Sequence, residues 1–242
     1  MLNWAIQEKD LLAVNPAALV TKQTESGGRS RFLREAEYKR FWAALDPEVL
    51  GHAGGAVAFK VLALTAQREM ELLRTRWSDI DLDSQTWTIP ADNAKNQCEH
   101  LVPLPPLALA LFRELHRMKG ERHDFVFESP VKPGSHVRRV FIEKRIIKIR
   151  KAAGLEDVTV HDLRRSATTY WGKLRVDQLL KKRLLNHSRR GDVTSAVYDR
   201  FEYLDEKLDA LRRWEALLLD MVDGILDPVE ATASNVVPLA RA

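Results

Sequence analysis

Four side chains between residues 161 and 198 could act together on one phosphate group. They are two histidines, an arginine and a tyrosine: His161, Arg164, His187 and Tyr198. An arginine fork can hold phosphate oxygens through two parallel hydrogen bonds, and a histidine can give or take a proton near neutral pH. A tyrosine hydroxyl becomes a nucleophile once its proton is removed. The set suits a group that gains negative charge in its transition state.

His161 and Arg164 lie three residues apart in a segment, 160–174, that lacks proline and has glycine only at Gly172. If the segment is helical, both side chains project from one face. An isolated pair at this spacing more often means a buried structural histidine and a solvated arginine. The phosphate interpretation therefore depends on the rest of the sequence.

Two further cations precede this stretch. Residues 56–65 are almost wholly apolar and predict a buried helix, which would deliver Arg68 to the edge of the site. Such an arginine needs a charge partner, and Glu71, three residues later, is the candidate. Lys95 lies in a polar, turn-rich stretch, 91–98, between two strand-like pieces, which predicts a lysine on a hairpin tip. In most proteins such a lysine only decorates the surface.

The ordered set of six residues strongly resembles the active site of the tyrosine recombinases, the phage-integrase family of DNA strand-exchange enzymes. The six are Arg68, Lys95, His161, Arg164, His187 and Tyr198, and the resemblance extends from about Arg31 to Trp214. It implies a site-specific DNA recombinase (integrase) that cleaves and rejoins DNA through a 3′-phosphotyrosyl intermediate. Because that link conserves the bond energy, no cofactor is expected. No metal-ligand spacing or phosphate-binding glycine loop is present in the sequence either, so we expect no metal.

The resemblance also implies how protons move. Tyr198 is the expected nucleophile, and because the ordinary pKa of tyrosine is ~10, it must lose its proton as it attacks phosphorus. His161 would assist that transfer. Lys95 would protonate the leaving 5′ oxygen from a hairpin whose mobility would be functional.

Arg68 and Arg164 would hold the non-bridging oxygens, and His187 would hydrogen-bond the phosphate. The family usually has glycine two residues before the first arginine, where this chain has Ala66. If that position requires a positive φ, alanine strains it by ~1 kcal/mol or more; if the glycine serves only close packing, alanine is harmless. Ten residues separate His187 from Tyr198, two more than the commonest family spacing, and the extra length should fall in the 189–192 loop.

The composition fits a globular protein with a large buried core. The chain has 242 residues, of which 45% are hydrophobic and 30% charged. Its single cysteine, Cys98, excludes an intramolecular disulfide and fits a reducing cytoplasm, the expected location. We find no apolar run long enough for a membrane span and no signal-peptide pattern.

The charge is unevenly distributed. Residues 204–242 contain four Lys or Arg and eight Asp or Glu, whereas residues 1–203 contain 34 and 26. A positive body with an acidic tail suits a polyanionic ligand and a tail that docks on protein. Ordinary surface solubilisation is the alternative.

The predicted fold is mainly α with a small antiparallel β-sheet (α+β), as in the catalytic domain of tyrosine recombinases (DNA breaking-rejoining enzymes). Residues 1–20 predict a helix, which the resemblance identifies as the remnant last helix of a core-DNA-binding domain, and residues 21–32 a basic linker. The catalytic domain would cover 33–203. A C-terminal helix would cover 204–226 and a flexible tail 227–242. Relatives pack this helix on a neighbouring protomer, and folding back on its own domain is the alternative.

Periodicity predicts further helices and strands: helices over 33–45, 105–119, 136–153 and 176–185, and strands over 87–89 and 101–104. The helix over 136–153 has an apolar stripe and a crowded basic flank, which predicts contact with DNA. The proposed DNA contacts are Lys22, Arg29, Arg31, Arg138, Arg139, Lys144, Arg145 and Lys148. A solvated surface is the alternative for all of them.

The resemblance implies double-stranded DNA attachment sites as partners, with a homo-tetramer on DNA and a monomer or weak oligomer without it. It also implies accessory DNA-bending or directionality proteins, and no membrane. Two other functions stay open. A type IB topoisomerase uses nearly the same residues, but the long helix after Tyr198 favours a recombinase. A truncated, inactive or DNA-binding-only integrase remnant would fit the missing half of the DNA clamp, although all six catalytic positions are filled.

Overall fold

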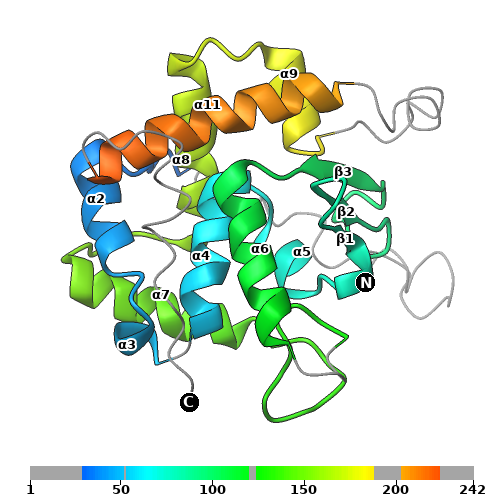
Figure 1. Cartoon of the computed structure of the whole chain (residues 1–242). Helices are drawn as coiled ribbons and strands as arrows, with labels where there is room; N and C mark the ends of the chain where they lie inside the picture. Colours follow the sequence, from blue (N-terminus) through cyan, green and yellow to red (C-terminus); the bar gives the residue numbers. More distant parts are fainter. Residues whose placement is uncertain (1–28, 52, 120–123, 188–202, 224–242) are drawn as a thin grey trace, which may run out of the picture. The chain divides into compact units, whose positions relative to one another are not determined.

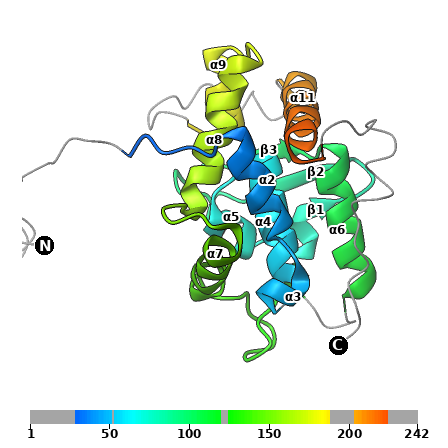
Figure 2. The ribbon, with the colours of Figure 1, turned by 90° about the vertical axis from the view of Figure 1, so that its left-hand side faces the viewer.

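One helix, α4 (Ala53–Thr65), lies at the centre of the domain (Figure 1). Its residues 56–59 and 61–64 are buried, because a helix that is apolar all round must be covered all round. Figure 2 shows two helices on opposite sides of α4: α6 (Pro106–Met118) and α7 (Val140–Ala153). Helix α4 also packs against α3 (Pro47–Leu50), α5 (Glu69–Leu73), α8 (Val160–Lys173) and α11 (Leu204–Asp223). The predicted buried helix is confirmed.

This computed structural model describes residues 29–51, 53–119, 124–187 and 203–223. The described residues from Arg31 onward form one compact unit. Several predicted features therefore lie outside the described residues: the helix over 1–20, most of the basic linker with Lys22, the 189–192 loop, Tyr198 and the 227–242 tail. Within the described ranges, the helices are all too short or too polar to cross a membrane.

A three-stranded antiparallel sheet lies beside α5 and α6 in Figure 1, in the order β1-β2-β3. Its strands are β1 (Ile80–Asp81), β2 (Thr86–Ile89) and β3 (His100–Pro103), and a short 3-10 helix, η1 (Trp77–Asp79), leads into it. Trp87 pairs with Val102, and both are buried, as is Ile89 two residues along β2. The structure thus confirms the mainly helical fold with a small antiparallel sheet.

The long helix α11 buries its apolar stripe within this domain. It packs against α2 (Glu35–Ala43), α4, α8, β3 and α9 (Gln178–Leu184). The indole Nε1 of Trp214 donates to the carbonyl of Ala63 at 2.9 Å, and its ring stacks on Tyr170 with centroids 5.6 Å apart. The described part of the predicted 204–226 helix therefore packs on its own domain, and packing on a neighbouring protomer stays a prediction.

Helix α7 begins four residues later than the periodicity predicted. The backbone before it is engaged in extended pairing, because His136 forms an antiparallel bridge with Glu128, and the Val137 N–H donates to the carbonyl of Phe127 at 2.8 Å. Arg139 is the N-cap residue. Arg138 and Arg139 therefore precede the helix instead of lying on its basic flank.

Candidate functional site

The turn from α4 into α5 places Arg68. Its guanidinium Nη1 lies 2.8 Å from Glu71 Oε1, and the Arg68 backbone N–H donates to the other Glu71 oxygen at 3.3 Å. The Glu71 side chain is 3% exposed and that of Arg68 23%. A carboxylate this buried needs its cation, and the two contacts fix the direction of the guanidinium. The predicted pairing of Arg68 with Glu71 is confirmed.

Arg164, on α8, is buried and held by two backbone carbonyls. Its Nη1 donates to the carbonyl of Ala66 at 2.5 Å and its Nη2 to that of Leu185 at 2.7 Å. Ala66 is fully buried and has φ +55°, so the turn after α4 adopts the left-handed conformation for which glycine is suited. The strained alternative for Ala66 therefore holds, and it costs ~1 to 2 kcal/mol.

A capping box at the start of α8 positions His161 and Arg164. The Asp162 carboxylate accepts from the Thr159 N–H at 2.8 Å and from its hydroxyl at 2.9 Å. Its other oxygen accepts from Arg165 at 2.8 Å, and Asp162 is fully buried. With the helix start fixed, His161 lies exposed in the first turn and Arg164 is buried one turn later.

A Schellman motif ends α9 and presents His187. Asn186 has φ +49°, its N–H donates to the carbonyl of Arg183, and the His187 N–H donates to the carbonyl of Lys182 at 2.9 Å. The ring nitrogen Nε2 of His187 then lies 3.4 Å from Arg164 Nη2. The geometry thus brings the predicted phosphate-binding histidine to the predicted phosphate-binding arginine.

The connection between β2 and β3 carries Lys95, as predicted. The Lys95 N–H donates to Glu71 Oε1 at 3.3 Å, and the Asn93 side-chain amide donates to the Glu71 carbonyl at 2.9 Å. The Lys95 side chain is exposed. One buried carboxylate therefore holds both the Arg68 guanidinium and the backbone of the lysine loop.

Burial sets the protonation states of the site. Burial, followed by repulsion from Arg68, lowers the pKa of Arg164 to about 9, so the guanidinium stays charged at pH 7. Partial desolvation, then the cations of Arg165 and Arg164, lower the pKa of His161, although its side chain is exposed. Partial desolvation, then Arg164 and Arg68, likewise lower the pKa of His187, which is also exposed. At neutral pH the site therefore combines two guanidiniums with two neutral imidazoles, which suits binding an anion and accepting a proton.

Two buried polar residues, Gln67 and His100, support α9 and were not predicted from the sequence. The Gln67 side-chain amide donates to the carbonyls of Leu184 at 3.0 Å and Thr65 at 2.9 Å. His100 Nε2 bonds to the same Leu184 carbonyl at 3.2 Å, and burial lowers the pKa of His100 to about 3. Gln67 could have been singled out from the sequence, because it is a polar residue between an apolar helix and an arginine. No sequence pattern indicated a role for His100 at the start of its strand.

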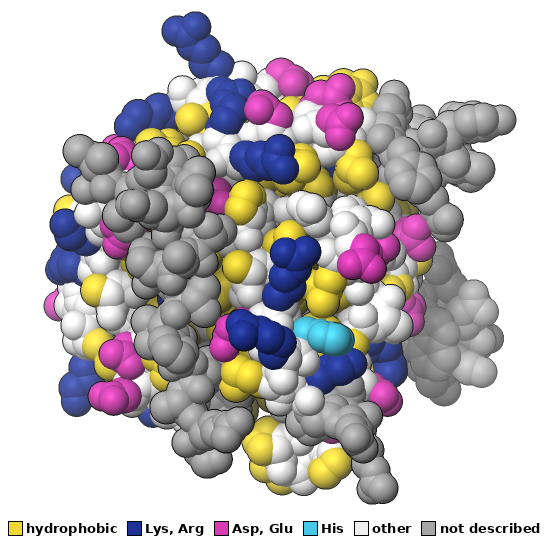
Figure 3. Space-filling model, in the orientation of Figure 1, with side chains coloured by type: hydrophobic (Ala, Val, Ile, Leu, Met, Phe, Trp, Pro, Cys, Tyr) yellow, Lys and Arg dark blue, Asp and Glu magenta, His cyan; other side chains and the backbone are white. Residues whose placement is uncertain are grey.

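Several predicted DNA contacts already have partners within the chain. They are Arg31 with Glu37, Arg139 with Glu69, Arg145 with Phe141, and Lys148 with the Leu50 carbonyl. Arg29, Arg138 and Lys144 are exposed. On the face drawn in Figure 3, basic and acidic side chains are interspersed. Which of these cations contact DNA stays a prediction.

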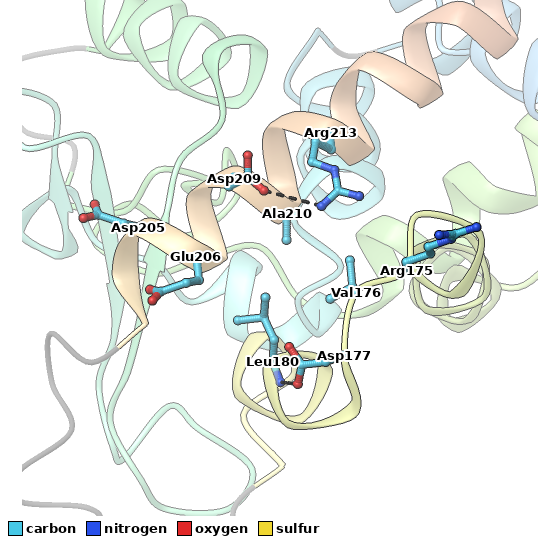
Figure 4. Close-up of a pocket in the computed structure, with 9 residues that line it drawn as sticks. All are labelled: Arg175, Val176, Asp177, Leu180, Asp205, Glu206, Asp209, Ala210 and Arg213. Carbon is cyan, nitrogen blue, oxygen red and sulfur yellow. Dashed lines mark hydrogen bonds and ion pairs between the residues drawn. The ribbon is translucent and has the colours of Figure 1, made fainter.

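A pocket lies between the start of α9 and the first turns of α11 (Figure 4). Its lining residues are Arg175, Val176, Asp177, Leu180, Asp205, Glu206, Asp209, Ala210 and Arg213. Arg213 forms an ion pair with Asp209 and donates a hydrogen bond to the carbonyl of Leu174. Four carboxylates against two guanidiniums do not suit a phosphate, so the cluster around Arg164 is the better candidate for an anion site.

Solved structures share this fold. The integrase from mycobacterium phage Brujita superposes with a TM-score of 0.61 at 16% identity, covering 92% of this chain and 73% of that one. A lambda integrase (75-356) dimer bound to a COC′ core site gives a TM-score of 0.55 at 23% identity, covering 79% and 68%. At these identities the likeness shows the fold alone.

Sequence comparison extends this result. The prophage integrase IntA of Escherichia coli (strain K12) is 31% identical over 156 residues, 64% of this chain and 36% of that protein. The integrase of Enterobacteria phage P4 is 27% identical over 246 residues, 91% and 53%. The chain thus spans about a third to about half the length of these relatives. The model of the phage integrase family matches residues 31–201, and the chain therefore belongs to that family.

Proposed function

We propose that this chain is the catalytic part of a site-specific DNA recombinase that cleaves and rejoins DNA through a 3′-phosphotyrosyl intermediate. The observation that carries the proposal is the contact of Arg164 with His187, beside an Arg68 and Lys95 that share Glu71. Residues from four separate elements thereby form one cationic site. Family membership supports the same conclusion.

In the proposed reaction, Arg68 and Arg164 bind the non-bridging oxygens of the scissile phosphate. Their directions are fixed before DNA arrives, by Glu71 for one and by backbone carbonyls for the other. Such preorganised charge stabilises the pentacoordinate transition state without further rearrangement. His187, neutral at pH 7, donates a hydrogen bond to the same phosphate.

The proton transfers use the remaining residues. The hydroxyl oxygen of Tyr198 attacks phosphorus while His161 takes its proton, which the lowered pKa of the imidazole leaves it free to accept. The bond from phosphorus to the 5′ oxygen breaks, and Lys95 gives that oxygen a proton. Rejoining is the reverse sequence from a 5′ hydroxyl, and it needs no cofactor.

The partners are proposed from the relatives. One structural neighbour is a lambda integrase tetramer bound to a Holliday junction, and another is the XerH recombinase bound to its difH substrate. We infer that this chain acts in the cytoplasm on double-stranded attachment sites, as a tetramer on DNA, with accessory DNA-bending or directionality proteins.

Covalent trapping tests the proposal. The protein and a Tyr198→Phe variant are incubated with nicked suicide duplexes carrying candidate attachment sites, and denaturation-resistant protein–DNA adducts are counted. Arg164→Lys is the second variant, because a lysine cannot replace both carbonyl contacts and the phosphate fork. We expect an adduct with the parent and none with Tyr198→Phe. With Arg164→Lys, the rate of adduct formation should fall ~10²-fold or more.

The same assay is run with an N-terminal extension taken from a full-length relative, since the chain spans about half of the phage P4 integrase. An adduct only with the extension would assign the chemistry to this chain and the DNA grip to the added part. If neither form gives an adduct, the chain is not a recombinase and the inactive-remnant function replaces it. Relaxation of supercoiled plasmid without strand exchange would favour the topoisomerase function.

A further inference from the structure

Two asparagine side chains connect the Lys95 loop to the residue before His187. The Asn96 amide donates to Asn186 Oδ1 at 3.0 Å and to the Asn186 carbonyl at 2.9 Å. In return, the Asn186 amide donates to Asn96 Oδ1 at 3.1 Å and to the Cys98 carbonyl at 3.1 Å. We call this reciprocal arrangement of Asn96 and Asn186 the amide clasp. Each amide acts as donor and acceptor, so the contact is specific in both directions.

The clasp is built into a rigid part of the chain. Asn186 is 8% exposed and occupies the left-handed position of the Schellman motif at the end of α9. Asparagine is one of the few residues with a side chain that adopts this conformation readily. Asn186 therefore combines two tasks, since its backbone directs His187 and its side chain holds the loop.

Lys95 is anchored from both sides as a result. On its N-terminal side, Asn93 and the Lys95 N–H itself bond to Glu71, the partner of Arg68. On its C-terminal side, the clasp holds Asn96 against Asn186. The loop is thereby fixed to the supports of both the first arginine and the second histidine.

We propose that Asn96 and Asn186 are positioning residues that hold the general acid Lys95 at the leaving 5′ oxygen. This inference rests on the proposed strand-cleavage function. Neither asparagine touches the phosphate; each acts through Lys95. On this proposal the clasp limits the hairpin mobility that was expected from the sequence to be functional, because the loop is bonded at Asn96 before DNA binds.

A substrate with sulfur in place of the bridging 5′ oxygen separates positioning from general structure. A thiol has a pKa of ~8.5, so it leaves as thiolate without a proton, whereas an alkoxide leaving group needs the acid. We expect Asn96→Ala and Asn186→Gly to slow cleavage of the ordinary phosphodiester at least ~10-fold, but that of the 5′-thio substrate less than ~3-fold. Glycine keeps the left-handed backbone at 186, so it removes only the amide. The double variant should be no slower than either single variant, because one contact is lost in each case.

A matched control is Gln97→Ala in the same loop. Gln97 is exposed, and its left-handed φ of +59° burdens alanine and glutamine alike, so this variant should cleave both substrates at the parent rate. A defect in the clasp variants that persists with the 5′-thio substrate would overturn the proposal, because the residues would then act through His187 or through the fold. If the parent itself forms no Tyr198-dependent adduct, the proposed function fails separately.

A second measurement needs no DNA. Cys98, the only cysteine of the chain, lies in this loop, and its carbonyl accepts from Asn186. The Cys98 thiol is half-buried and lies 3.6 Å from the carbonyl oxygen of Asn96, so its rate of alkylation under native conditions should rise when the clasp is lost. We expect both clasp variants to react roughly 2- to 3-fold faster than the parent, with unchanged far-UV circular dichroism, and Gln97→Ala to match the parent. Equal Cys98 rates in all variants would show that the amides do not hold the loop, and would refute the clasp whether or not the chain cleaves DNA.

Discussion

Replacing Glu71 with glutamine should destabilise the fold by about 2 kcal/mol. The substitution keeps the shape of the side chain and removes its charge, leaving the Arg68 guanidinium without a counterion 2.8 Å away. A hydrogen bond to a charged group contributes ~1.5 to 3 kcal/mol, and breaking a fully buried ion pair costs ~3 to 5. Because Arg68 is 23% exposed, water recovers part of that loss, and the lower range applies.

Urea unfolding of the parent and the variant measures this loss in the free energy of unfolding. In thermal unfolding, the melting temperature of the variant should be lower by ~4 to 8 °C. Glu69→Gln is the matched control, two residues earlier on α5. Glu69 pairs with Arg139, whose side chain is 64% exposed, and burial raises the pKa of the Glu69 carboxyl despite that partner. Its loss should cost under ~0.5 kcal/mol. If Glu71→Gln were no more costly than Glu69→Gln, the central role of the Glu71 carboxylate would be refuted.

Three further predictions concern residues around the site. Ala66→Val should cost more than ~2 kcal/mol, since a β-branched side chain is placed at a buried positive φ, whereas Ala66→Gly should stay within ~1 kcal/mol of the parent; urea unfolding measures both. Burial raises the pKa of Glu215, which accepts from the Leu107 N–H, to about 7. The contribution of the protonated Glu215 carboxyl to the free energy of unfolding is therefore complete below pH 4.5 and is lost as the pH rises to about 7. Glu215→Gln should flatten the dependence of that free energy on pH between these values. The effect of His100 has the opposite sign, because burial lowers its pKa to about 3. The free energy of unfolding should fall as the pH drops below 6.5, and this fall should be smaller in His100→Gln.

The sequence was sufficient for the elements that carry the site. The apolar run before Arg68 predicted α4, and the change from helical to alternating periodicity predicted the sheet with Lys95 between its strands. The Arg68–Glu71 pair was also predicted from spacing alone; in the structure it joins the N-cap residue of α5 to the third residue of that helix. These features are local, and local patterns encode them.

The contacts that join these elements could not be predicted in the same way. No periodicity indicates that the carbonyl of Ala66 would accept from Arg164, or that Asn96 would bond to Asn186. Each depends on how packed elements meet, and on backbone turns of positive φ that the residue types only permit. The start of α7 was predicted too early for the same reason, since bridging between His136 and Glu128 overrode a helical pattern.

The carbonyl contact of Arg164 spans 98 residues of sequence, and the clasp of Asn96 with Asn186 spans 90. Contacts this distant form only after the chain has closed large loops, so they are expected late in folding. A chain that has made its helices but not yet docked α8 on α4 and α9 on α11 has its cations apart and cannot form the proposed anion site. During denaturation, DNA cleavage and global structure should therefore disappear in one cooperative transition, and a partly unfolded chain should not nick DNA.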